Sequence, residues 1–263
     1  MKGRAASLKL GDVANKKAGS SQGEATKLLA QLRKDLRAVA SKDWALGSAK
    51  TKVFGEDSYG AGDIFLGITV PDTRVIAKKY KDLPQEELLT LARSKYHEER
   101  LTALVILNNK YAKARDNAER IELFEFWLGL VKDYKVNNWD LIDASAPYMG
   151  EILSRHLGYG APFLRGLAKS ENLWERRASI ILTFPLIRIG KFGPTLAMAK
   201  EALTDEHHLI HKAAGWMLRE VGKRDQDLLT DFILRHKAKM PRTMLRYAIE
   251  KYSEKERKAF LAT

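Results

Sequence analysis

The sequence predicts an all-α protein built as an α-solenoid, a curved superhelix of antiparallel helix pairs. Apolar residues recur at the helical period along most of the 263 residues, and no segment shows a convincing β-strand alternation. Comparable helix starts fall at His97, Asn138, Leu173, His208 and Arg242, at intervals of 41, 35, 35 and 34 residues. A nearly fixed period of this length is typical of solenoids, in which each repeat buries one face on the next.

The N-terminal stretch differs in composition from the rest of the chain. Residues 1–23 are rich in Gly, Ala, Ser and Lys, carry five Lys or Arg against one Asp, and offer little to bury. We therefore predict a flexible basic arm over residues 1–23 and a single repeat domain over residues 24–263. The domain opens with an amphipathic helix over Glu24–Ala40, whose apolar stripe consists of Leu28, Leu29, Leu32, Leu36 and Val39.

The stretch Trp44–Asp63 is predicted to be an irregular loop. Its glycines are Gly47, Gly55, Gly60 and Gly62. Helix is improbable there, because each glycine costs roughly 1 kcal/mol relative to alanine. The last two glycines form only a fragment of a phosphate-binding loop, since no third glycine or P-loop lysine follows and no strand precedes them.

From Phe65 onward almost every segment has a helical pattern. Pro71 and Pro84 each suit the first turn of a helix. Further helices are expected over His97–Ala112, Ala118–Tyr134, Trp139–Arg155, Ala161–Ala168, Leu173–Ile189, Pro194–Leu203, His207–Val221, Gln226–His236, Arg242–Tyr252 and Glu254–Leu261. At the later repeat starts, basic residues such as Arg176 precede small residues. The small residues let neighbouring helices pack closely, and the basic residues would then lie along one edge of the stack. This texture favours a HEAT-like repeat over a four-helix bundle.

The composition limits the classes of function. Because the chain has no cysteine, disulfides, thiolate nucleophiles and cysteine-based zinc or iron–sulfur sites are excluded. No apolar run approaches the roughly 20 residues that span a bilayer. We expect no membrane association, a monomer and a cytoplasmic location, which would be nucleoid-associated in a bacterium or archaeon.

The formal charge of +13 and the pI near 9.7 predict an acidic partner. The arm accounts for +4, so +9 remains on residues 24–263. Nucleic acid is the commonest partner of so basic a body, ahead of an anionic membrane or an acidic protein. General solubility is the alternative explanation of the charge.

Trp139 and Asp143 form an unusual pair in the stretch 137–147. Four residues apart on a helix, an indole and a carboxylate leave the same face, although one normally seeks the core and the other water. Such a pair at the margin of the buried stripe is a candidate functional site. The alternative is structural: Asn138 caps the helix, Asp140 favours its dipole and Trp139 packs sideways on a neighbour.

Further aromatic and basic residues recur at the same phase of later repeats. Trp174 precedes Arg177 by three residues, and the other groups are Lys212, Trp216 and Arg219, then Arg242 and Arg246. If the repeats stack in register, these side chains converge with Trp139 along one wall. Lysine and arginine would follow a phosphate backbone, and indoles would stack on sugar or on a cationic base. Taken singly, Trp174 and Trp216 also suit the core.

Four segments make the chain similar to a known family. They read Phe-Leu-Gly-Ile-Thr-Val-Pro-Asp-Thr-Arg (65–74), Asn-Asn-Trp-Asp-Leu-Ile-Asp (137–143), Asn-Leu-Trp-Glu-Arg-Arg-Ala (172–178) and Lys-Ala-Ala-Gly-Trp-Met-Leu-Arg-Glu (212–220). Over about residues 65–252 the chain resembles the AlkD family of alkylpurine DNA glycosylases. The resemblance implies a HEAT-like solenoid that excises cationic N3- and N7-alkylated purines from duplex DNA without flipping the base, in contrast to most glycosylases.

The resemblance also implies roles for individual residues. Trp139 and Asp143 match the family's catalytic tryptophan and aspartate, Arg177 its cleft arginine and Trp216 its second cleft tryptophan. Arg219 matches a basic residue that would reach the DNA backbone. Asp143 would stabilise an oxocarbenium-like sugar and orient water, the indoles would hold sugar and lesion, and Arg177 would fix a phosphate. No metal or cofactor is required.

One segment departs from the family's pattern. Active relatives carry a helix with aromatic residues just before the segment at Phe65, whereas Lys52–Asp63 reads here as a loop. A non-catalytic HEAT-like protein that binds damaged or branched DNA is therefore the alternative function, and a helical scaffold for an acidic protein is a third.

A histidine cluster also needs an interpretation. His207 and His211 share a helical face beside His208, which suggests metal-ligand spacing, but no carboxylate on that face offers a third ligand. A structural or phosphate-contacting role is favoured over a metal site.

Overall fold

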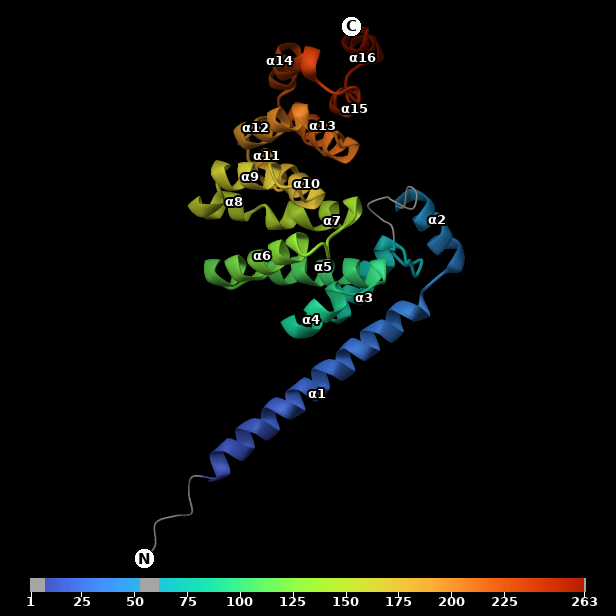
Figure 1. The fold of residues 1–263 in the computed structure, drawn as a ribbon, viewed down its shortest axis with the longest axis vertical. Coiled ribbons are helices and arrows are strands. Elements are labelled where there is room, and N and C mark those ends of the chain that lie inside the picture. Colours follow the sequence, from blue (N-terminus) through green and yellow to red (C-terminus); the bar gives the residue numbers. More distant parts are fainter. Residues whose placement is uncertain (1–7, 53–61, 263) are drawn as a thin grey trace, which may run out of the picture. The chain divides into compact units, whose positions relative to one another are not determined.

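The computed structural model describes residues 8–52 and 62–262. It divides into two compact units, Met1–Ile106 and Leu107–Thr263. That residues 24–263 form a single repeat domain stays a prediction. Each unit is described by itself (Figure 1).

The first unit contains a helix much longer than predicted. Its elements are α1 (Leu8–Ala38), α2 (Lys42–Lys52), α3 (Val70–Lys79), α4 (Gln85–Ala92) and the first part of α5 (His97–Ala112). Helix α1 packs against α3 and α4, and its buried residues Leu29, Leu32 and Leu36 belong to the predicted stripe. Because α1 begins at Leu8, the boundary between the predicted arm and the first helix lies inside a helix. That residues 1–23 form a flexible arm stays a prediction.

Helix α2 corrects the predicted loop over Trp44–Asp63. Its first turn is closed by Ser41, whose carbonyl accepts a hydrogen bond from the N–H of Ala45 at 2.9 Å. Gly47 is tolerated inside this helix because a single glycine weakens a helix without preventing it. Residues 53–61 lie outside the described residues, so the loop predicted there is untested. Trp44 on α2 is 61% exposed.

The start of α5 holds the segment before α3 in place. The buried carboxylate of Glu98 accepts hydrogen bonds from the backbone N–H groups of Leu66, Gly67 and Ile68, at 2.8, 2.9 and 3.3 Å. A carboxylate that accepts several N–H donors satisfies an irregular backbone that has no helix or sheet partner. The segment also makes an isolated parallel bridge between Ile64 and Tyr96.

Two further acidic groups pair with cations in this unit. Asp63 lies 3.0 Å from His97 Nδ1 and accepts a 2.6 Å hydrogen bond from Arg100. Burial works to raise the pKa of Asp63, but the hydrogen bond to His97 and the Arg100 guanidinium lower it below its usual range. Glu99, also buried, accepts from Arg33 of α1.

The second unit is a stack of helix pairs. Its elements are the rest of α5, then α6 (Asn117–Lys132), α7 (Trp139–Met149), α8 (Ile152–Arg155), α9 (Ala161–Ala168), α10 (Leu173–Ile181), α11 (Phe184–Arg188), α12 (Gly193–Glu201), α13 (His208–Gly222), α14 (Gln226–His236), α15 (Arg242–Ala248) and α16 (Glu254–Leu261), with short 3-10 turns at Leu157–Tyr159, Ala202–Thr204 and Lys237–Lys239. Helices follow one another up this stack in Figure 1. Across the described residues no strand is present, and the predicted all-α class is confirmed.

Four helices of the stack start at the positions that the repeat pattern predicted, or one residue later. Helices α7, α10, α13 and α15 begin at Trp139, Leu173, His208 and Arg242. Helix α10 packs against both α7 and α13, and α13 packs against α15. Helices α9 and α12 contact each other in turn, so successive pairs bury their faces on their neighbours as a solenoid requires.

Two helices predicted to be continuous are each broken. The range Trp139–Arg155 forms α7 and α8, and Leu173–Ile189 forms α10 and α11. The breaks meet in space, because a Cβ added to Gly150 would lie 2.0 Å from the carbonyl oxygen of Leu182. Pro147 also lacks the N–H that would continue the hydrogen bonds of α7.

A second glycine sets the contact between α13 and α15. A Cβ added to Gly215 would lie 2.5 Å from both the Met244 carbonyl oxygen and the Tyr247 Cβ. We predict that Gly215→Ala destabilises the protein by about 1 to 3 kcal/mol, because backbone must shift to admit the methyl group. Urea unfolding followed by circular dichroism measures the change.

Gly166→Ala is the matched control. Gly166 lies inside α9, and nothing lies within 4 Å of an added Cβ. This substitution should stabilise the protein by about 0.5 to 1 kcal/mol through helix propensity. Equal effects of the two substitutions would contradict a close approach of α13 and α15 as the reason for Gly215.

Candidate nucleic-acid interface

Side-chain caps fix where helices α7, α10 and α13 begin. The Asn138 Oδ1 accepts from the Trp139 N–H at 2.8 Å, and the Asn172 Oδ1 accepts from the Trp174 N–H at 2.9 Å. In α13 the His207 Nδ1 accepts from the Leu209 N–H at 3.1 Å. These caps satisfy N–H groups that a helix leaves unpaired at its start.

Four charged residues occupy the same position within four helices of the stack. Asp143, Arg177, Lys212 and Arg246 are each the fifth residue of α7, α10, α13 and α15, respectively. Because these helices pack in series, one row of side chains crosses the stack, which we call the fifth-residue row. One member is acidic and three are basic.

The Asp143–Arg177 ion pair is the central contact of this row. Arg177 Nε donates to Asp143 Oδ1 at 2.9 Å, and Arg177 Nη2 donates to Asp143 Oδ2 at 2.8 Å. Arg177 Nη1 donates to the Leu209 carbonyl of α13 at 2.5 Å. The Arg177 side chain is 4% exposed and that of Asp143 19%. The geometry is the bidentate fork that holds a carboxylate in one orientation.

The surroundings of Asp143 act on its pKa in opposite directions. Burial raises the pKa of Asp143, while the positive charge and hydrogen bonds of Arg177 oppose that rise. Arg177 therefore favours the ionised form of the carboxylate, whereas burial favours the protonated form.

Two half-buried indoles flank the ion pair in sequence. Trp139 is the first residue of α7, one helical turn before Asp143. Trp216 lies on α13, where its ring centroid is 6.2 Å from that of Phe184 on α11. Both indoles keep part of their surface accessible. Asn138 caps α7 as predicted, and Trp139 is nonetheless only half-buried.

Two predicted DNA contacts are corrected by burial. Trp174 is 3% exposed and packs in the core, because its place in the first turn of α10 turns it inward. Arg177 was expected to fix a phosphate. Its guanidinium instead faces Asp143 and Leu209 inside the protein, so it positions Asp143 and offers no surface to DNA.

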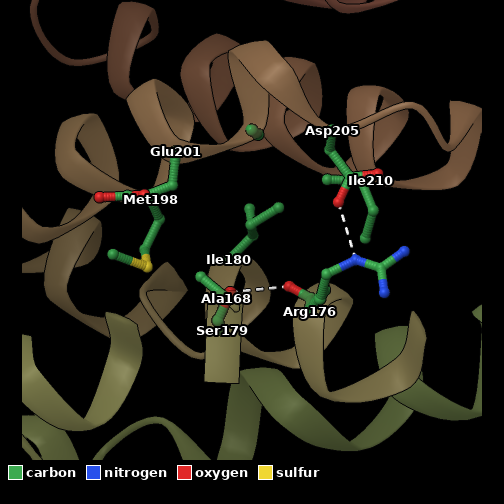
Figure 2. A pocket seen from close by; sticks show the side chains of 9 residues that line it. Ala168, Arg176, Ser179, Ile180, Met198, Glu201, Asp205 and Ile210 are labelled. Carbon is green, nitrogen blue, oxygen red and sulfur yellow. Dashed lines mark hydrogen bonds and ion pairs between the residues drawn. The ribbon is translucent and has the colours of Figure 1, made fainter. Parts of the chain in front are cut away.

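Arg176 also points into the protein. Its Nε donates to Asp205 at 2.8 Å, and its Nη1 donates to the carbonyls of Ser170 and Glu171 at 3.0 Å. Figure 2 shows Arg176 and Asp205 lining a small pocket with Ser179. Arg176 thus joins α10 to the start of α13, and its predicted role in DNA binding is not supported by its geometry.

The remaining basic residues of the predicted set differ in whether they have partners within the protein. Arg219 pairs with Glu250, and Arg242 donates to the Leu261 carbonyl at 2.7 Å. Lys212 is half-buried and Arg246 exposed, and neither has an ion-pair partner among the described residues. Lys212 and Arg246 are therefore the members of the predicted set best placed to meet phosphate.

The histidines at the start of α13 have mainly structural contacts. His207 caps the helix, and His211 Nε2 lies 2.5 Å from the Asp205 carbonyl oxygen. His208 is mostly exposed. Its partial burial, followed by the positive charge of Lys212, lowers its pKa. Among residues 8–52 and 62–262, no group of three or more His, Asp or Glu residues could hold a metal ion.

The same described ranges contain no helix with the length and apolar character needed to cross a bilayer.

Known proteins resemble this chain in sequence family and in fold. The family model described as DNA alkylation repair enzyme matches residues 32–252. The chain belongs to this family. A solved structure described as a predicted DNA alkylation repair enzyme from Enterococcus faecalis is similar to this chain, with a TM-score of 0.62 and 17% identity over 82% of this chain and 97% of that one. At that identity the likeness supports the fold alone. No curated protein sequence matches the chain.

Sequence reasoning missed several residues of the site. The Leu209 carbonyl that anchors Arg177 carries no side-chain signal. Asn172 could have been found as a helix cap, although its further hydrogen bond to the Val131 carbonyl, at 3.1 Å, depends on tertiary packing. Phe184 lay inside a predicted continuous helix, and only the break before α11 brings it near Trp216.

The pairing of Asp143 can be tested by titration. We predict that Arg177→Met raises the pKa of Asp143 further, because the burial remains and the opposing cation is lost. A carboxyl ¹³C NMR titration measures this pKa. Since its folded pKa would then lie further above the unfolded value, the variant's stability relative to wild type should fall as pH rises through that range.

Arg176→Met is the matched control, because it removes the neighbouring arginine and leaves the Asp143–Arg177 contact in place. The Asp143 titration should stay as in the wild type. An unchanged Asp143 titration in Arg177→Met would contradict the electrostatic role assigned to Arg177.

Proposed function

We propose that this protein is a DNA glycosylase that hydrolyses the N-glycosidic bond of cationic N3- and N7-alkylated purines in duplex DNA, without flipping the base. Membership of the DNA alkylation repair enzyme family supports a repair role. The observation that carries the finer proposal is the carboxylate of Asp143, held by a bidentate arginine one turn from a half-exposed indole.

This arrangement suits the chemistry of alkylated purines. Such a purine already carries positive charge, so it leaves with the electron pair of the glycosidic bond and needs no strong general acid. Positive charge then develops on the deoxyribose, and an oriented carboxylate stabilises it best where water is excluded. Asp143 would also accept the proton of the water that adds to the anomeric carbon.

Arg177 would act through Asp143 and not on DNA. Its two hydrogen bonds fix the direction of the carboxylate, and its third anchors it to α13. Holding a catalytic group within a narrow range of orientations is a large part of what an enzyme site supplies. Trp139 and Trp216 would pack on the sugar and the cationic base.

DNA would be held by the basic residues that remain free. Lys212 and Arg246 lie in the fifth-residue row with Asp143. Their charges would bind phosphates on one side of the lesion and offset the repulsion between Asp143 and the backbone.

The reaction gives the first test of this proposal. Wild-type protein should release 7-methylguanine and 3-methyladenine from methylated duplex DNA, measured by chromatography of free bases. Asp143→Asn and Trp139→Ala should each reduce release by about 100-fold or more, because each removes an interaction that strengthens in the transition state. Binding to the same DNA should change little, or tighten for Asp143→Asn.

Glu151→Gln removes the same charge at an exposed position on the surface and should leave release unchanged. If the wild type binds DNA but releases no base, the enzyme proposal is wrong. The non-catalytic DNA-binding protein would then be supported.

The DNA contacts can be tested by salt dependence. Each phosphate contact contributes about 0.9 to the slope of log binding constant against log salt. Arg246→Ala should therefore weaken binding and reduce the magnitude of the slope by about 1, measured by fluorescence anisotropy. Lys258→Ala should leave the slope unchanged, since Lys258 pairs with Glu254 at 2.7 Å on α16. A wild-type affinity independent of salt would argue against DNA as the partner.

A further inference from the structure

Tyr134 lies just after α6 in a left-handed backbone conformation. Its φ is 55°, and no other residue apart from glycine has positive φ in the described ranges. The N–H of Tyr134 donates to the Val131 carbonyl at 3.2 Å, and the N–H of Lys135 donates to the Leu130 carbonyl at 2.8 Å. These bonds form a Schellman motif, whose left-handed position is usually glycine because a Cβ is strained there.

The chain uses glycine at the same position of another helix. Helix α11 is followed by Gly190 at a φ of 74°, and the Lys191 N–H donates to the Leu186 carbonyl at 2.9 Å. Glycine therefore closes this motif without strain in the same unit. A tyrosine kept in spite of strain points to a role for its side chain.

The side chain of Tyr134 is largely exposed. It is 54% exposed, and within the described residues it makes no hydrogen bond or ring contact. Two other tyrosines of this unit have side-chain partners, since Tyr159 bonds to Glu125 and the Tyr252 hydroxyl lies 2.8 Å from that of Thr230, whereas Tyr148 and Tyr247 are also exposed but carry no backbone strain. Internal packing thus does not explain why an aromatic residue ends α6.

The surroundings of Tyr134 suit nucleic acid. Lys135 follows it directly, and Lys132 precedes it by two residues with Asp133 between them; neither ammonium group has an ion-pair partner among the described residues. Trp139 follows five residues later, which places the two aromatics within about 17 Å of each other along the chain. An exposed aromatic beside lysines can pack on the sugars of a DNA strand while the lysines bind its phosphates.

We propose that Tyr134 is a further DNA-binding residue, whose ring packs on a deoxyribose of the duplex beside the nucleotide held by Trp139. This inference rests on the proposed function, because it takes the start of α7 to face DNA. The strained backbone aims a rigid aromatic side chain away from the protein, and contact with DNA is the reason that tyrosine stands where glycine would be more stable.

The test separates stability from binding. Tyr134→Gly relieves the strain and removes the ring, whereas Tyr134→Phe keeps both the strain and the ring. Tyr148→Ala is the control, since Tyr148 is 48% exposed but lies about 140° around α7 from Asp143. Thermal unfolding, anisotropy with a fluorescein-labelled methylated duplex, and base release are measured for all variants and the wild type.

Tyr134→Gly should raise the melting temperature by roughly 2 to 4 °C, because it removes the strain. The same substitution should weaken DNA binding about tenfold, because the apolar contact between the ring and the sugar is lost. Tyr134→Phe should bind within about twofold of the wild type, and Tyr148→Ala should bind as the wild type does.

A Tyr134→Gly variant that binds as tightly as the wild type would overturn the proposal. So would an equal loss in Tyr148→Ala, or a wild type that does not bind duplex DNA. If the wild type binds DNA but releases no base, the glycosylase proposal fails alone. Tenfold weaker binding by Tyr134→Gly would then still support the role of Tyr134.

Discussion

The second unit depends on one buried cation. Arg177 is almost fully enclosed, and an arginine in that position is tolerated only when its donors are paired. Its partners come from two different helices, the Asp143 carboxylate of α7 and the Leu209 carbonyl of α13. The cap from His207 fixes the backbone at Leu209 in turn. The carboxylate that would do the chemistry is therefore oriented by the same contacts that set the register of three successive helices.

The first unit is organised by acidic residues at the start of a single helix. Glu98 bonds to three backbone N–H groups of an irregular segment, and the neighbouring Glu99 pairs with α1. Hydrogen bonds and cations compensate the loss of hydration of these buried side chains. In both units, polar groups inside the protein thus define where helices and loops meet, and apolar packing then fills the space between them.

Much of the fold was predictable because it repeats. The starts of α7, α10, α13 and α15 follow from caps and apolar periodicity, which are local properties of the chain. The breaks before α8 and α11 were not predicted, because the approach of Gly150 to the Leu182 carbonyl involves two separate segments. Helix α2 was not predicted for a different reason. The unfavourable helix propensity of four glycines was assigned to the whole range 44–63, although only Gly47 lies within α2.

The sequence by itself determined the all-α class, the phase of the repeats and the pairing of Trp139 with Asp143 on one helical face. It could not decide which aromatic and basic residues of that phase reach solvent. Helical spacing defines a face, but only the neighbouring helix decides whether that face is covered. Trp174, Arg176 and Arg177 were thus predicted as surface contacts. Trp174 and Arg177 are instead buried and Arg176 is paired with Asp205, while Trp139 and Trp216 keep accessible surface. The tertiary structure made this selection, because burial depends on contacts between segments far apart in the chain.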